Sequence, residues 1–344
     1  DEIVEKRKWM DRQHFLDLMG ATNLIPGPNS TEMTMHCGHE RAGIPGLFVA
    51  GLCFIFPAVV ITGIFAWIYA EYGQLPEVAA FVFGIKPAVL AIIAGAVLKL
   101  GKKALKGWEL GVLGGLVLVA SILGVNEILA LLVAGVAGMS YFLSKSKMSG
   151  SLKSVALPLS LMSISAASIA KVSAAKVFWS FLKVGAVLYG SGYVLFAYLD
   201  AELVTNGLLS REGLIDAVAI GQFTPGPVLS TATFIGYQMA GVSGAIAATA
   251  GMFLPSFLFV WILNPLVPKM RKSKPLRFFL DSVNVAAVAV MLGVLVEMSL
   301  DTLVDWRAFV ILGVGIWATF GTKKVNAMWL VLVGAVLGYL LNLI

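Results

Sequence analysis

Apolar residues run along this chain in long, nearly uncharged stretches that are separated by short polar loops. Several of these stretches exceed the ~20 residues that a helix needs to cross the hydrocarbon core of a bilayer. A backbone in lipid must satisfy its own hydrogen bonds, so the pattern predicts an all-α integral membrane protein. Spans are expected over 44–70, 78–98, 108–125, 128–143, 177–199, 242–263, 278–299, 306–321 and 325–344.

Two further segments, 13–43 and 210–240, interrupt the apolar pattern in the same way. Each contains the tripeptide Pro-Gly-Pro, at 26–28 and at 225–227. A helix does not continue through this tripeptide, because the prolines remove backbone donors and the glycine adds conformational freedom. The last proline suits the first turn of a new helix. Interrupted segments at matching positions of two halves indicate the binding site of a transporter.

The charges of equivalent loops indicate how the two halves are oriented. The loop 71–77 has no Lys or Arg, whereas its counterpart 264–277 has five. The next loop, 99–106, has four lysines, whereas its counterpart contains Asp301 and Asp305 with a single arginine. Basic loops stay on the cytoplasmic side, so the two halves are predicted to be inverted relative to each other.

The predicted fold is therefore a pair of inverted-topology repeats, 1–143 and 177–344, joined by a polar connector over 144–176. Each repeat holds one re-entrant element, broken at Pro-Gly-Pro, and about four to five spanning helices. The element 13–43 is expected to enter from the cytoplasm and 210–240 from outside. In this alignment Asp1 matches Asp200, which follows an apolar span, so we expect about 25 or more further apolar residues before Asp1.

Composition agrees with a polytopic membrane protein and excludes several other classes. Of the 344 residues 59% are hydrophobic and only 13% are charged, which a soluble domain of this size cannot accommodate. The net charge of +6 comes from short clusters between apolar spans, so it does not indicate nucleic-acid binding. The cysteines Cys37 and Cys53 allow at most one disulfide. The Gly-rich stretch 108–143 suits either internal packing or a homodimer.

The broken elements are the candidate substrate site. A helix that starts after Pro-Gly-Pro has free backbone N–H groups and the positive end of its dipole there, and both attract anions. Two such starts that meet inside the membrane would hold a tetrahedral oxyanion; the alternative is a pair of structural kinks without a ligand. The candidate substrate-binding residues are Asn23, Pro26, Gly27, Asn29, Ser30, Thr31, Lys86, Gln222, Thr224, Gly226, Ser230 and Thr231.

Four ionisable residues within or beside apolar stretches are candidates for function, since such groups are costly in lipid. Lys86 would supply a positive charge to the anion or pair with a buried acid such as Asp17 or Glu32. Asp17, Glu32 and Asp216 are candidates for proton coupling, and local capping or pairing is the alternative.

The histidines of the chain allow one different class of function. His36 and His39 recur at helical spacing with Glu32 and Glu40. A membrane metalloenzyme would use such a face, but nothing elsewhere supplies further ligands, so no metal and no cofactor are expected. A titrating cluster near the cytoplasmic mouth, or a solvated helix end, explains the pattern as well.

Several longer motifs resemble a known family. The first half contains Gly20-Ala-Thr-Asn-Leu-Ile-Pro-Gly-Pro-Asn-Ser-Thr31, and the second contains Gly221-Gln-Phe-Thr-Pro-Gly-Pro227 and Gly190-Ser-Gly-Tyr-Val-Leu195. These stretches resemble the two domains of chromate ion transporters. The chain departs from that family in beginning downstream of an apolar segment with a Phe-Gly-Gly-Pro-like turn, which corresponds here to the region of 190–192.

The resemblance implies a secondary transporter rather than an enzyme. Such a protein would lie in the cytoplasmic membrane and export chromate by alternating access, driven by the proton gradient, with sulfate as a related substrate. Helix ends recognise tetrahedral dianions by charge and shape, so uptake of sulfate or molybdate is the alternative within transport.

Overall fold

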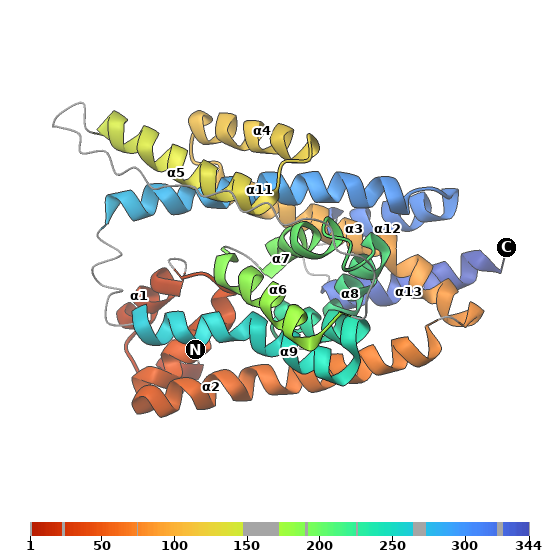
Figure 1. The fold of residues 1–344 in the computed structure, drawn as a ribbon, viewed down its shortest axis with the longest axis horizontal. Helices are drawn as coiled ribbons and strands as arrows, with labels where there is room; N and C mark the ends of the chain where they lie inside the picture. Colours follow the sequence, from red (N-terminus) through yellow and green to blue (C-terminus); the bar gives the residue numbers. More distant parts are fainter. Residues whose placement is uncertain are drawn as a thin grey trace.

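The computed structural model describes residues 2–22, 25–73, 75–146, 172–189, 192–224, 226–263, 273–321 and 326–343, and these parts are helical and contain no strand (Figure 1). The helices of the first half are α1 (Arg12–Thr22), α2 (Asn29–Tyr72), α3 (Pro76–Ala104), α4 (Trp108–Ile122) and α5 (Glu127–Ser146). Those of the second half are α6 (Ala174–Val187), α7 (Leu195–Leu199), α8 (Arg211–Phe223), α9 (Thr231–Leu263), α11 (Lys274–Thr302), α12 (Trp306–Gly321) and α13 (Ala327–Asn342).

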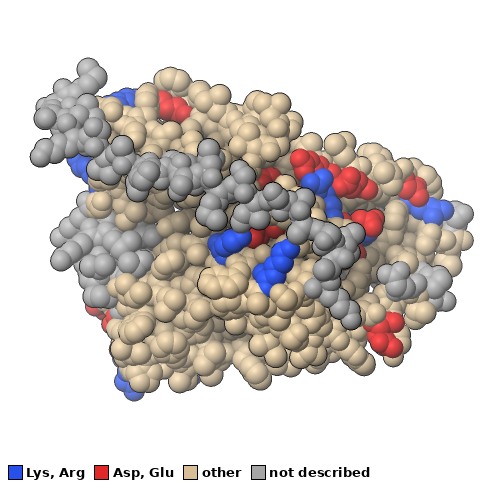
Figure 2. Space-filling model, viewed as in Figure 1, with Lys and Arg blue, Asp and Glu red and all other residues tan. Residues whose placement is uncertain are grey.

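The expected all-α membrane protein is confirmed. Five helical stretches are long and apolar enough to cross a membrane, and three shorter apolar helices accompany them in the described chain. The outer faces of the long helices carry large apolar side chains such as Phe56 and Trp67, which are at least half exposed. Figure 2 shows that charged side chains gather along the middle and upper part of the molecule, whereas the lower flank, formed by α2 and α9, is almost free of charge.

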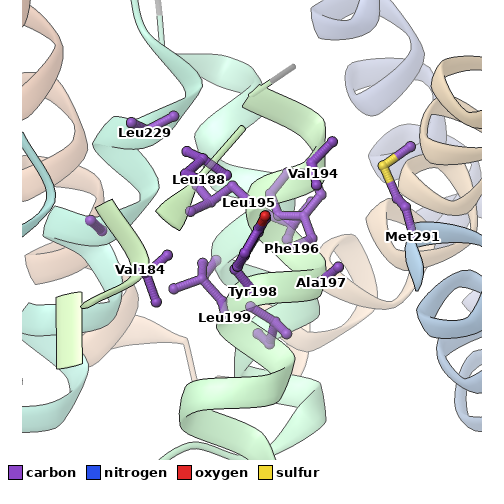
Figure 3. Close-up of a cluster of buried hydrophobic side chains, with 14 of the residues drawn as sticks. Val184, Leu188, Val194, Leu195, Phe196, Ala197, Tyr198, Leu199, Leu229 and Met291 are labelled. Atoms are coloured by element: carbon purple, nitrogen blue, oxygen red, sulfur yellow. The ribbon is translucent and has the colours of Figure 1, made fainter. Parts of the chain in front are cut away.

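One expected span is wrong in detail. The apolar stretch 177–199 was predicted as one helix, but α6 ends at Val187 and Leu188 adopts an extended conformation. The chain resumes as a short turn, Gly192–Val194, and then as α7. A Gly-rich sequence favours such a break over helix continuity. The side chains of α7 are fully buried, and Figure 3 shows Leu195 beside Leu188 and Ala197 on the side that faces Met291.

The helices of the two halves recur at a nearly constant spacing. Pro76 and Lys274, the first residues of α3 and α11, are 198 positions apart, and both helices have 29 residues. Trp108 and Trp306, which begin α4 and α12, are also 198 apart. The expected repeat therefore has a structural counterpart in helix lengths and starts.

The kinks in α2 and α9 repeat as well. Ala42 and Gly43 have φ values of −146° and 61°, and Ala240 and Gly241 have −148° and 62°. The positive φ requires glycine at the second position of each kink. Gly38 lies so close to the backbone of Gly46 that a Cβ atom would overlap its carbonyl group. The chain thus turns back on itself, giving each helix a short arm before the kink and a long arm after it.

The second short arm is one residue shorter than the first. From Pro28 to Ala42 the first arm advances fourteen positions, whereas from Pro227 to Ala240 the second advances thirteen. The second arm starts with the 3₁₀ turn Val228–Ser230, whereas α2 starts directly as an α-helix. A 3₁₀ turn rises about 2.0 Å per residue against about 1.5 Å in an α-helix, so three residues span the length of four.

The two halves pack mainly across each other. Figure 1 shows α4 and α5 lying on α11, and α12 and α13 lying close to α3. The contacts use small residues: Gly135 faces Val283 of α11, and Gly334 faces Ala88 of α3. Small residues let helix backbones approach closely, which is how helices associate in lipid.

The long arms of α2 and α9 lie side by side and antiparallel. Phe48, early in the long arm of α2, stacks on Phe257 near the end of α9, with ring centroids 5.4 Å apart. Further along α2, Ala58 lies against Gly226 in the break that precedes α9. Each long arm therefore passes the Pro-Gly-Pro break of the other half, and this crossing positions the candidate site.

Candidate functional site

A cavity of about 700 Å³ lies between the two broken elements. Asn29 and Ser30, at the start of α2, form one wall, and Gly226 and Pro227 form another. Asn284 of α11 also lines the cavity. The helix start of the first half and the break of the second half thus face one cavity, as expected for a shared binding site.

A second feature of the cavity is its positive charge. Lys99 and Lys103 from the end of α3, Lys106 just beyond it, and Arg277 from the start of α11 line its rim. Lys106 donates a hydrogen bond of 2.6 Å to the only acid among the lining residues, Asp281. The other three cations form no ion pair with an acid in the described part of the chain, so the cavity attracts anions.

The two glycines of the breaks allow close approach of neighbouring backbone and side chains. Gly27 has a φ of 135° and Gly226 a φ of 131°, conformations that residues with a Cβ atom rarely adopt. The N–H of Gly27 donates a 2.6 Å hydrogen bond to the carbonyl of Leu188, at the end of α6. A Cβ atom on Gly226 would lie 2.7 Å from the Cβ of Ala58. Each break is therefore fixed by the other half.

Three of the hydroxyl groups predicted to bind the anion lie behind the cavity wall. Thr31, Ser230 and Thr231 are fully buried and do not line the cavity. Thr231 donates to the carbonyl of Val228 over 2.7 Å, which satisfies its hydroxyl locally. Asn29 and Ser30 are the polar side chains of the first helix start that face the cavity.

A hydroxyl from the first half completes the break of the second. Thr62 Oγ1, in the long arm of α2, lies 3.1 Å from both Thr224 Oγ1 and Ser230 Oγ. Val260 stands 198 positions after Thr62 and has no hydroxyl. The two breaks therefore differ in their polar surroundings although their backbones repeat.

The remaining candidates at the breaks are placed as follows. Pro26 is buried beside Gly27. Gln222, near the end of α8, is partly buried, and its Nε2 atom has no hydrogen-bond partner among the described residues. Asn23 lies outside the described residues, and so does the side chain of Asp17, whose backbone belongs to α1. Their roles stay predictions.

Lys86 has a different partner from the two acids considered for it. Its Nζ atom lies 3.7 Å from Asp216 Oδ1 and 3.7 Å from Glu212 Oε1, both on α8. Tyr69 donates a 2.5 Å hydrogen bond to Asp216 Oδ2. Asp216 is buried, whereas Glu212 is exposed. Lys86 does not line the cavity, so this cluster of Lys86, Asp216, Tyr69 and Glu212 is a separate ionic site.

The histidines form no metal centre in the described part of the chain. No group of three or more His, Cys, Asp or Glu side chains there has an arrangement that could hold a metal ion. His14 Nε2 lies 3.0 Å from a carboxylate oxygen of Glu40, which links α1 to the short arm of α2. The membrane-metalloenzyme alternative gains no support from this geometry.

A further cavity, of about 620 Å³, lies on the apolar flank between the long arm of α2 and the two arms of α9. Its walls include Trp67, Tyr237 and Ile246, and none of its lining residues is charged. Thr233 and Thr249, which also line it, are 2.8 Å apart and satisfy each other. Such a surface suits lipid chains and not an inorganic anion.

Residues 1–139 and 175–339 match the family described as Chromate transporter, which covers most of the chain in two parts. This chain belongs to the chromate transporter family. The resemblance inferred from the motifs is therefore confirmed, and the two-part match fits a repeat.

Several curated relatives align with nearly the whole of this chromate transporter family member. It is 29% identical to the chromate transport protein of Cupriavidus metallidurans, over 98% of this chain and 85% of that protein. It is 27% identical to the probable chromate transport protein of Synechococcus elongatus, over 90% of this chain and 80% of that protein. It is 26% identical to an uncharacterized transporter of Methanocaldococcus jannaschii, over 98% and 87%. No solved structure matches the chain.

Sequence reasoning missed several residues of the site in this family member. The lysines of 99–106 were used only to predict which side of the membrane this loop lies on, yet Lys99 and Lys103 line the cavity. Thr62 and Tyr69 looked like ordinary residues of an apolar span. Ser256, whose hydroxyl lies beside Gly27 of the first break, could have been noticed, because it stands 198 positions after Ala58 and has a hydroxyl in place of a methyl group.

Proposed function

We propose that this protein exports chromate-like tetrahedral oxyanions across the cytoplasmic membrane by alternating access coupled to the proton gradient. The observation that carries the proposal is the cavity in which the start of α2 and the break before α9 face each other beneath a cationic rim. Family membership supports an oxyanion as the substrate, since several relatives are named for chromate transport.

The chemistry of the cavity suits a small dianion. Unpaired backbone N–H groups at a helix start and the positive end of the helix dipole favour negative charge. Asn29, Ser30 and Asn284 add polar side chains that can donate hydrogen bonds. Lysine and arginine at the rim raise the local anion concentration. A tetrahedral oxyanion has acceptor oxygens on every side, so it can be bound by both walls at once.

The direction of transport is inferred from charge and topology. Lys99, Lys103 and Lys106 belong to a basic loop that the positive-inside rule assigns to the cytoplasm. The cavity that they line then opens to the cytoplasm, where an exporter takes up its substrate. The antiparallel long arms of α2 and α9 support an inverted pair of repeats, which is the usual basis of alternating access.

Asp216 is the carboxylate best placed for proton coupling. It is buried, accepts from Tyr69, and lies near Lys86, which also approaches the exposed Glu212. A proton on Asp216 would remove its charge and release Lys86 towards Glu212, which shifts a cation within the membrane. Asp17 and Glu32 stay predictions as further coupling residues.

Everted membrane vesicles test the function and its direction. We expect chromate to accumulate in vesicles that contain the protein when a proton gradient is imposed, and a protonophore to abolish the accumulation. Vesicles with the Asp216→Asn variant provide the control for coupling. If sulfate is carried in the opposite direction while chromate is ignored, the export proposal is wrong and oxyanion uptake takes its place.

The rim cations give a separate prediction about affinity. Replacing Lys103 and Arg277 together by glutamine is expected to weaken chromate binding roughly tenfold or more. Each substitution removes a positive charge that attracts the anion or donates a hydrogen bond to it. The loss should shrink at high salt, since both groups are exposed and screened. Calorimetry on the purified protein measures it. Lys274→Gln, an exposed lysine of the same helix start that does not line the cavity, is the matched control; equal losses in both variants would contradict a specific site.

A further inference from the structure

Four buried oxygen atoms stand behind the first break, and apart from a contact between the Glu32 carboxylate and the Ser256 hydroxyl they have no hydrogen-bond partner among the described residues. They are both carboxylate oxygens of Glu32, the hydroxyl of Thr31 and the hydroxyl of Ser256. All three residues have no exposed surface. Unpartnered polar atoms at this depth are costly, so a group of them indicates a missing ligand.

The backbone of the break brings two of these side chains together. A Cβ atom on Gly27 would overlap the carboxylate of Glu32 and lie 2.7 Å from Ser256 Oγ. Glu32 comes from the short arm of α2, whereas Ser256 comes from the long arm of α9. Carboxylate, hydroxyl and unwound backbone therefore converge on one point, between the two halves of the protein.

The corresponding place in the other half is built differently. There Gly226 faces the methyl group of Ala58, which stands 198 positions before Ser256. The hydroxyls of Thr62, Thr224 and Ser230 lie within hydrogen-bonding distance of one another. That break has no carboxylate, and its hydroxyl groups are satisfied. Of the two breaks, only the first thus has buried side-chain oxygens that lack a hydrogen bond to the described residues.

The nature of these atoms selects the class of ligand. Among the described residues no Lys or Arg forms an ion pair with Glu32, so the carboxylate lacks a protein cation. A proton would satisfy one oxygen and leave the others unpaired, whereas a small hard cation attracts several oxygens at once. Unwound backbone carbonyls and the C-terminal end of a half-helix are known sodium ligands in transporters. Here α1 ends at Thr22, just before the break.

We propose that Glu32, Ser256 and the backbone of the first break bind a dehydrated sodium ion. The site lies behind the helix start whose Asn29 and Ser30 face the cavity, and Glu32 stands about one helical turn further along α2 than Asn29. His36, one turn further along α2, is the nearest titratable side chain on the same arm. The site goes beyond the proposed oxyanion transport and does not require it.

Thermal unfolding of the full chain in lipid nanodiscs tests the sodium site without any oxyanion. Sodium chloride is replaced stepwise by choline chloride or potassium chloride at constant ionic strength and mildly alkaline pH. We expect sodium to raise Tm in a saturable manner, because a ligand that binds only the folded state stabilises it. In Ser256→Ala the half-saturating sodium concentration should rise roughly tenfold, since one ligand to a charged partner is lost.

Two further variants make the result decisive. Glu32→Gln should abolish the response to sodium, and Ser282→Ala, which removes another fully buried hydroxyl on α11, should leave it unchanged. If Glu32→Gln does not fold, Ser256→Ala still carries the test because it keeps the carboxylate. A wild-type Tm that is equal in sodium and choline overturns the proposal, and so does a Tm that follows pH but not sodium. An unaltered sodium response in Ser256→Ala also overturns it.

Discussion

Lys86→Met is expected to destabilise the protein by about 3–5 kcal/mol, because it leaves a buried carboxylate without its cation. Asp216 is 5% exposed, and Lys86 Nζ lies 3.7 Å from its Oδ1 atom. Tyr69 alone cannot compensate the charge, since its hydroxyl is a neutral donor. Thermal and denaturant unfolding of the purified variants measure the loss.

The double variant Lys86→Met/Asp216→Asn is the matched control. Removing both charges takes away the desolvation penalty, so most of the stability should return. The affinity for chromate should change little in either variant, because Lys86 does not line the cavity. A variant Lys86→Met of normal stability but with much weaker chromate binding would show that this lysine faces the anion after all.

Gly27→Ala should prevent normal folding or cost roughly 3 kcal/mol or more, through backbone strain and overpacking together. The φ of 135° disfavours any residue with a Cβ atom. The added methyl group would also overlap the Glu32 carboxylate, which is fully buried. Expression, monodispersity and Tm of the purified protein report the effect.

Gly43→Ala separates the two causes. Gly43 also has a positive φ, of 61°, but no atom lies within 4 Å of the position that its Cβ would take. Its substitution should therefore show the backbone strain alone, about 1–3 kcal/mol, and cost less than Gly27→Ala. Equal effects at the two glycines would mean that the close packing around Gly27 contributes nothing.

The sequence was sufficient to predict the class of fold and the places where helices break. Hydrophobic length identified most spans within a few residues, because lipid imposes a minimum length and excludes open strands. Pro-Gly-Pro identified both breaks, because proline and glycine act locally. The prediction of one helix over 177–199 was wrong for a related reason. This stretch contains a Gly-Ser-Gly motif that disfavours helix, and α6 ends at Val187 although the apolar character of the sequence continues.

Which side chains of one half contact which side chains of the other half could not be predicted in the same way. Lys86 and Asp216 are 130 positions apart, and nothing local indicates that α3 meets α8 rather than α1. The burial of Thr31 and Ser230 depends on which side of the helix start faces the cavity. The second short arm has one residue fewer, which changes which side chains face the cavity. The 3₁₀ turn at its start restores the length of the arm. Contacts between distant helices and the side of a helix that faces a cavity have no local pattern in a single sequence.

The central claim is that one oxyanion is bound between the two broken elements. A structure of the protein with bound chromate, or with the electron-denser tungstate, tests it most directly. We predict a single strong density peak within hydrogen-bonding distance of the α2 start at Asn29 and Ser30 and of the break at 226–228. Density at the Lys86–Asp216 cluster instead, or an empty cavity at saturating anion, would contradict it.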